Sequence, residues 1–310
     1  MKYISLILLS TLALLAVISC SDPSTVVFNP FTGRDSTPPT LLSIAMRTSI
    51  EAVLTFDENV IIKAEAFSVE DNKIQSVSVW DNEVVITFSK PLVFGVATPL
   101  NGRVQDFGGN SMRFTIHLWA KNEHIPSLII NEFSTKGSEN HPDRVELYAQ
   151  GSGNLAGVRI EGVNDSFIFG DYPVKAGQYI VVVFSKGTLQ EGAFVSINQA
   201  GLATNNGYIC LYTSPEWDAT LIDCVIYSTM EAVTHNGFGS KAVAEKAQEL
   251  FLAGHWSGAL GSDAIDISKA TATRSVNRSL LGDTNSAVDW YICATSNASF
   301  GSVNSTNRFD

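Results

Sequence analysis

Apolar and polar residues follow three successive patterns along this chain. A nearly unbroken apolar run extends from Ile4 to Ile18, and a proline-rich polar stretch covers residues 21–40. Most of the remaining chain alternates apolar and polar positions with a period of two, as strands with one buried face do. The pattern therefore predicts an all-β protein after an N-terminal segment of a different kind.

The strands predicted before residue 122 are short and separated by turn residues. Val84 to Phe88 gives the strongest strand signal among them, because it consists of β-branched and aromatic residues. A region of this length with strands at this spacing is typical of a β-sandwich. The predicted strands are Leu41 to Met46, Ile50 to Phe56, Ile74 to Trp80, Glu83 to Ser89 and Met112 to Trp119.

A second series of strands follows Pro126, which marks the predicted boundary between two domains. Tyr179 to Phe184 is apolar at every position, and this predicts a strand buried on both faces. The predicted strands are Leu128 to Phe133, Arg144 to Tyr148, Phe167 to Phe169, Gln178 to Phe184, Phe194 to Ile197, Tyr208 to Tyr212 and Leu221 to Tyr227.

One helix is expected to interrupt this second series. Lys241 to Leu252 carries apolar residues at helical spacing, Ser240 precedes it as a suitable N-cap, and Gly254 can close it. The fold class predicted from the whole pattern is all-β, with two tandem sandwiches and one short helix inserted in the second.

The N-terminal run has the features of an export signal, since a positive start, an apolar stretch and a small residue lead to a cleavage point. It is short for a permanent transmembrane helix. Its end, Val17-Ile18-Ser19-Cys20, resembles the bacterial lipobox. The resemblance implies a signal peptide over residues 1–19, a diacylglyceryl group on Cys20 and a tether over residues 20–35. The alternative is a plain secreted protein whose cysteine falls at the cleavage point.

The first predicted sandwich, over residues 36–122, resembles the bacterial Ig-like domains of surface-layer proteins. The resemblance rests on Asp35-Ser-Thr-Pro-Pro-Thr40, Leu54-Thr-Phe-Asp-Glu-Asn-Val60 and Val104-Gln-Asp-Phe-Gly-Gly-Asn110. Asp57 and Asn59 depart from the family's usual serine and proline. Such modules generally act as spacers or binding units. Asp106 and Asn110 are assigned to a turn in preference to a metal site.

The second predicted domain, over residues 126–306, resembles the lamin-tail domain, an Ig-like sandwich. The opening strand Ile130-Asn-Glu-Phe133 fits the family, and Arg144-Val-Glu-Leu-Tyr148 fits its second strand, with Arg144 and Ala149 replacing the usual tryptophan and asparagine. Residues 229–269 stand out as an insertion. The remaining matches are Gly177 to Phe184, Arg274 to Arg278, Asp283 to Trp290 and Gly301-Ser-Val-Asn304.

Charge narrows the range of partners. The chain has a net charge of −11, and loss of Lys2 with the signal makes the mature chain more negative by a single charge. No dense cluster of Lys and Arg occurs in the sequence. Because nucleic-acid binding depends on concentrated basic residues, nucleic acid is disfavoured as a partner.

Beyond Cys20 the chain has Cys210, Cys224 and Cys293, an odd number that cannot pair completely within one chain. Cys210 and Cys224 are equidistant from Trp217, the middle of a predicted hairpin, and are expected to face each other across two strands. They either form a disulfide or stay as buried thiols. The sequence has no Cys-x-x-Cys spacing, so it offers no support for zinc chemistry.

The candidates for catalysis are few. Glu132 and Glu146 could adjoin on neighbouring strands and serve in acid–base or metal chemistry. The same glutamates recur in the lamin-tail pattern, which favours a structural role. The common hydrolase and phosphate-loop motifs are absent from the sequence. We therefore predict no enzymatic activity, catalytic residue, metal or cofactor.

Two tryptophans are candidates for a binding surface. Trp217 lies at the predicted hairpin tip and Trp256 just after the predicted helix, where a folded core has least use for them. The alternative is local packing.

These observations predict a non-enzymatic cell-envelope lipoprotein, held to the membrane through the lipid on Cys20, that presents a lamin-tail domain to a protein or glycan partner. Ser21 does not match the aspartate used for inner-membrane retention, so the outer membrane or cell surface is favoured over the inner membrane. The alternative is a non-catalytic accessory subunit of an extracellular hydrolase system, because bacterial lamin-tail domains often accompany such enzymes.

Overall fold

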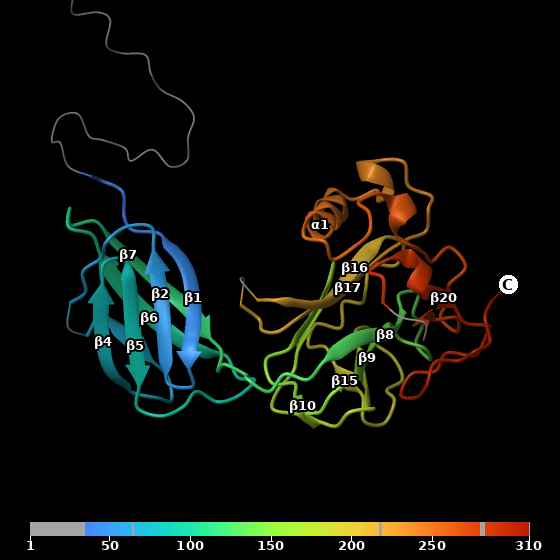
Figure 1. Cartoon of the computed structure of the whole chain (residues 1–310), viewed down its shortest axis with the longest axis horizontal. Helices are drawn as coiled ribbons and strands as arrows, with labels where there is room; N and C mark the ends of the chain where they lie inside the picture. Colours follow the sequence, from blue (N-terminus) through green and yellow to red (C-terminus); the bar gives the residue numbers. More distant parts are fainter. Residues whose placement is uncertain (1–34, 64, 217–218, 280–282, 310) are drawn as a thin grey trace, which may run out of the picture.

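The computed structural model describes residues 35–63, 65–216, 219–279 and 283–309. The described chain is almost entirely β, with one α-helix (Figure 1). Cys20, the predicted signal and most of the predicted tether lie outside the described residues. None of the described helices is long and apolar enough to cross a membrane.

Two antiparallel sheets build the N-terminal part of the described chain. The four-stranded sheet has the order β1-β2-β5-β4, and the three-stranded sheet has the order β3-β6-β7. The bounds are β1 Leu41–Thr48, β2 Glu51–Phe56, β3 Phe67–Val69, β4 Ile74–Trp80, β5 Glu83–Phe88, β6 Thr98–Gln105 and β7 Ser111–Leu118.

Alternation along these strands produces the core between the two sheets. On β5, for example, Val84, Ile86 and Phe88 are fully buried, while the residues between them are half-buried. They pack with Leu54 and Leu100 in one hydrophobic cluster. The five strands predicted here are confirmed, whereas β3 and β6 are absent from the sequence prediction.

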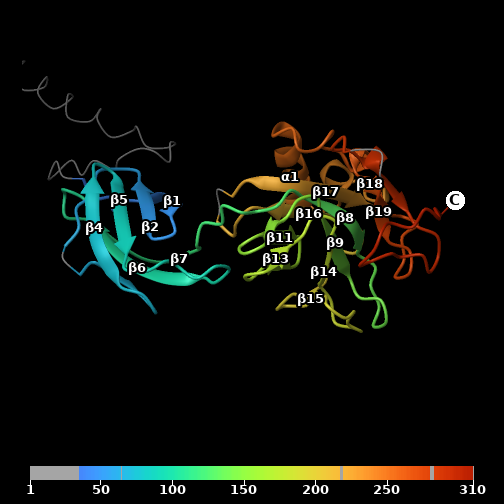
Figure 2. The same cartoon turned by 60° about the horizontal axis from the view of Figure 1, so that its bottom comes forward.

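A six-stranded and a five-stranded sheet build the C-terminal region of the chain (Figure 2). The six-stranded order is β15-β14-β9-β8-β19-β20, and the five-stranded order is β12-β11-β16-β17-β18, beside the small pair β10-β13. The bounds are β8 Leu128–Ser134, β9 Arg144–Ala149, β10 Gly153–Asn154, β11 Arg159–Gly162, β12 Ser166–Ile168, β13 Pro173–Val174, β14 Tyr179–Val183, β15 Phe194–Val195, β16 Gly207–Tyr212, β17 Leu221–Ser228, β18 Ile265–Asp266, β19 Val276–Arg278 and β20 Trp290–Ile292.

A second hydrophobic cluster fills this region and is separate from the first. Strand β14 is buried on both faces, because Ile180 to Phe184 are each at most 5% exposed, and this confirms its prediction. The predicted strand Phe194 to Ile197 is shorter than expected, since β15 ends at Val195 and Ile197 is 95% exposed. The domain boundary at Pro126 stays a prediction.

The helix α1, Lys241–Leu252, has the predicted bounds. The hydroxyl of Ser240 accepts a hydrogen bond from the amide of Val243, which satisfies one of the free donors of the first turn. Gly254 ends the helix in the left-handed conformation, with φ +76°. The buried side of α1, which includes Val243 and Leu250, belongs to the same cluster as strands β16 and β17. The described residues also form three 3-10 turns, at His235–Gly237 (η1), Gly261–Asp263 (η2) and Ala287–Asp289 (η3).

Candidate functional site

The two glutamates considered for catalysis lie opposite each other on β8 and β9, and both are fully buried. Their carboxylates bind the C-terminal segment. Ser299 donates to Glu132 from its amide at 2.9 Å and from its hydroxyl at 2.8 Å. The amide of Gly301 donates to Glu146. The adjoining positions predicted for this pair are confirmed, and their oxygens accept hydrogen bonds from backbone amides and side chains of the same chain.

Burial sets the electrostatics of this pair. It raises the pKa of Glu146 to about 8, against the hydrogen bonds from Gly301 and Asn131, and the nearby Glu132 raises it further. Burial also raises the pKa of Glu132, although Ser275 and Ser299 donate to it. Two carboxyl groups this close in a dry interior resist ionising together.

Asparagine side chains extend the network from these carboxylates to the end of the chain. Asn131 donates to Glu146 and to Asn304, each at 2.7 Å. Asn304 in turn donates to the backbone carbonyl of Arg278 at 2.9 Å. Because each group has a partner within the chain, the arrangement fastens the C-terminal segment to the six-stranded sheet.

Arg278 joins this network to the opposite sheet. Its guanidinium is 4% exposed, lies 2.6 Å from the carboxylate of Asp223 on β17 and donates to the carbonyl of Ile130 at 2.7 Å. It also pairs with Asp283 and lies over the ring of Trp290. Burial raises the pKa of Asp223 to about 6, although the charge of Arg278 acts to lower it.

Cys210 and Cys224 are directly opposite partners on β16 and β17, as predicted. Both are buried free thiols, and Cys293 is a third. The sulfur of Cys224 lies 3.4 Å from the carbonyl of His255, to which it donates. Burial raises the pKa of Cys210 to about 12. A disulfide between Cys210 and Cys224, the other alternative, is not formed in this structure.

Trp256 is not part of a binding surface, and that prediction is wrong. The side chain is 3% exposed, because the chain after α1 folds back and the indole donates to the carbonyl of Asp263 at 3.0 Å. Local packing therefore explains this tryptophan. Trp217, the other predicted surface aromatic, lies outside the described residues.

An apolar groove that the sequence prediction missed lies between the outermost strands of the two larger sheets. Strands β18 and β20 are the last strands of their sheets, and both line a groove of about 640 Å³. Val288 on η3 is 82% exposed at this groove, and Phe309 is 39% exposed. The pairing of β18 with β17 joins segments that are far apart in the sequence, so no local pattern marks this edge.

The turn predicted at Asp106 and Asn110 is confirmed. Asn110 donates to both carboxylate oxygens of Asp106, each at 2.7 Å, and to the carbonyl of Asp35 at 2.9 Å. Oxygens of Asp35, Glu58 and Asp106 lie within 4.8 Å of one another. Burial raises the pKa of Glu58, and the charges of Asp106 and Asp35 add to the rise. The hydrogen bonds from Asn110 therefore give the buried carboxylate of Asp106 a structural role in the turn.

Comparison with known families gives a match in the C-terminal region of the chain. A family model described as a protein second domain matches residues 126–196 and 193–292. Together the two matches cover more than half of the 310 residues. No curated protein matches the chain.

Proposed function

The chain belongs to the family of this protein second-domain model, and we propose that it is a non-enzymatic, membrane-anchored lipoprotein of the bacterial cell envelope. In this proposal Cys20 carries the lipid, the following polar segment acts as a tether, and the second domain binds a protein or glycan partner. The lipobox-like residues Val17 to Cys20 support the anchor, and Ser21 favours the outer membrane or cell surface.

The finer assignment of the second domain is to the lamin-tail class. Its support is that motifs distant in sequence meet in one network. Glu132 comes from the opening motif, Glu146 from the second strand and Asn304 from the closing motif, and Asn131 bridges the last two. Glu132, Glu146 and Asn304 therefore each have a structural role in holding the C-terminal segment.

The finer assignment of the first domain is to the Ig-like class of surface-layer proteins. Here Asn110 of the last motif donates to the carbonyl of Asp35 in the first motif. The amide of Thr40 also donates to Asp57 of the middle motif at 2.7 Å. These bonds join the three motifs at one end of the sandwich, which is the end where the described chain begins.

The observation that carries the proposal is the use of the buried glutamates. Glu132 and Glu146, the best candidates for acid–base chemistry in the sequence, hold the C-terminal segment in place and are fully buried. The groove between β18 and β20, in contrast, leaves apolar side chains open to solvent. Exposed apolar surface of this kind favours binding over catalysis.

The proposal is tested by affinity capture from cell-envelope fractions with residues 21–310. Val288→Asp places a charge in the groove, and Val233→Asp is its matched control, because Val233 is 93% exposed and lies outside the groove. We expect the wild type and the control to retain the same bound partner and Val288→Asp to lose it. Equal capture by both variants, or hydrolytic activity of the purified protein, would contradict the proposal.

A further inference from the structure

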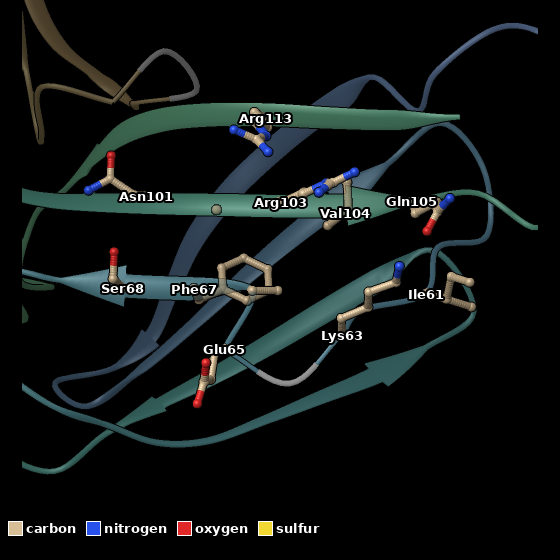
Figure 3. A pocket seen from close by; sticks show the side chains of 12 residues that line it. Ile61, Lys63, Glu65, Phe67, Ser68, Asn101, Arg103, Val104, Gln105 and Arg113 are labelled. Carbon is tan, nitrogen blue, oxygen red and sulfur yellow. The ribbon is translucent and has the colours of Figure 1, made fainter. Parts of the chain in front are cut away.

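We infer that the outer face of the β3-β6-β7 sheet is a binding pocket for a phosphate group. The pocket is about 370 Å³ in volume, and its lining includes Lys63, Arg103 and Arg113 (Figure 3). It belongs to the N-terminal sandwich, so the inference is independent of the partner proposed for the second domain.

The central feature is a pair of like charges on neighbouring strands. Arg103 on β6 and Arg113 on β7 are directly opposite residues in the antiparallel register. Both side chains are exposed, whereas Val104 and Phe114 beside them pack toward the core. Like charges placed directly opposite each other on one face destabilise a sheet. A bound anion between the two guanidinium groups would remove this repulsion.

The two arginines also differ from the other arginines of the described chain. Each of the others has a carboxylate within ion-pair distance or an aromatic ring under its guanidinium. Arg103 and Arg113 have neither within the described residues, and Arg103 donates only to the hydroxyl of Ser111 at 3.1 Å. The others are Arg47, Arg144, Arg159, Arg274, Arg278 and Arg308.

Lys63 supplies a third cation from the stretch that precedes β3 and lies beside the Arg103 to Gln105 end of β6. Backbone bonds hold this segment at both ends, from Ile61 to Gln105 at 2.7 Å and from Arg103 to Ala66 at 2.9 Å. Glu65 is the single acidic residue of the lining. The pocket therefore carries an excess of positive charge in a chain whose net charge is −11.

This charge and these donors match a phosphate group. A phosphate monoester has a charge of about −1.5 to −2 at pH 7 and three strong acceptor oxygens. Guanidinium groups bind such oxygens in pairs. Asn101 and Gln105 add neutral polar groups along β6. The volume lies within the range of about 300–1,000 Å³ of small-molecule pockets, so a sugar or headgroup that carries the phosphate also fits.

The test is a calorimetric titration of residues 21–310 with inorganic phosphate and with glucose 6-phosphate at low ionic strength. We expect saturable binding by the wild type and at least tenfold weaker binding by Arg113→Gln. Lys73→Gln removes an exposed cation outside the pocket and is expected to bind like the wild type. Sedimentation with phosphatidylcholine vesicles that contain phosphatidic acid separates the sources, since Arg113-dependent binding there assigns the phosphate to a lipid headgroup.

Thermal unfolding without ligand gives a second readout. Arg113→Gln removes the repulsion between the two arginines, so its unfolding midpoint is expected to equal or exceed that of the wild type. Phosphate is then expected to raise the midpoint of the wild type and leave that of Arg113→Gln unchanged. A control titration with acetate completes the test. Equal affinity for acetate and phosphate, an equal loss of phosphate affinity in Arg113→Gln and Lys73→Gln, or no saturable binding by the wild type would each overturn the inference.

Discussion

Replacing Glu146 by glutamine tests the electrostatics of the buried network. Burial raises the pKa of this carboxyl from 4.5 to about 8, so the folded protein binds its proton more tightly than the unfolded chain does. The stability gained from the bound proton is complete below pH 4.5 and is lost as the pH rises toward 8. Since one pKa unit corresponds to about 1.4 kcal/mol, the loss across this interval is at most about 5 kcal/mol.

The assay is urea unfolding of the wild type and of Glu146→Gln at several values between about pH 4.5 and pH 8.5, which brackets the raised pKa. Glutamine has nearly the shape of the protonated glutamic acid and does not titrate, so the free-energy difference between the two proteins reports the titration of Glu146 together with its coupling to Glu132. We expect the wild type to lose stability relative to Glu146→Gln as the pH rises. A difference that is constant, or that moves in favour of the wild type with rising pH, would refute the reasoning.

Three further predictions concern stability and thiol reactivity. Arg278→Ala leaves the buried carboxyl of Asp223 without its cation, and we expect urea unfolding to show a loss of about 3–5 kcal/mol. Gly102→Ala brings a methyl group into the ring of Phe114, and thermal unfolding should show a loss of about 1–3 kcal/mol from overpacking. The buried thiols, with the pKa of Cys210 raised to about 12, should react with a disulfide reagent at mildly alkaline pH only after unfolding; fast reaction of the folded protein would contradict their burial.

Local signals in the sequence predict much of this fold. The spacing of apolar residues and the capping by Ser240 lead to the observed bounds of α1, because a helix depends on contacts within a few residues. The run at Val84 to Phe88 becomes β5, because β-branched and aromatic residues favour strands. Pro99 and Gly102, in contrast, hide β6, since both residues are uncommon within strands.

The features that the sequence does not predict depend on pairing between distant segments. Without β6, the opposition of Arg103 and Arg113 cannot be foreseen, because it exists only in the register of β6 with β7. The prediction that Trp256 is exposed fails because its burial depends on the chain folding back to Asp263. The glutamates are the intermediate case, since their proximity is predicted but their contacts with Ser299 and Gly301 require the folded tail.

The anchor on Cys20 is the central claim of the proposed function, and metabolic labelling tests it most directly. Cells that express the full chain or its Cys20→Ala variant are grown with a palmitate analogue, and label on the purified proteins is measured. We predict label on the wild type, its loss in Cys20→Ala, and recovery of the wild type in the membrane fraction. An unlabelled wild type, or equal label on the two proteins, would contradict a lipid anchor at this cysteine.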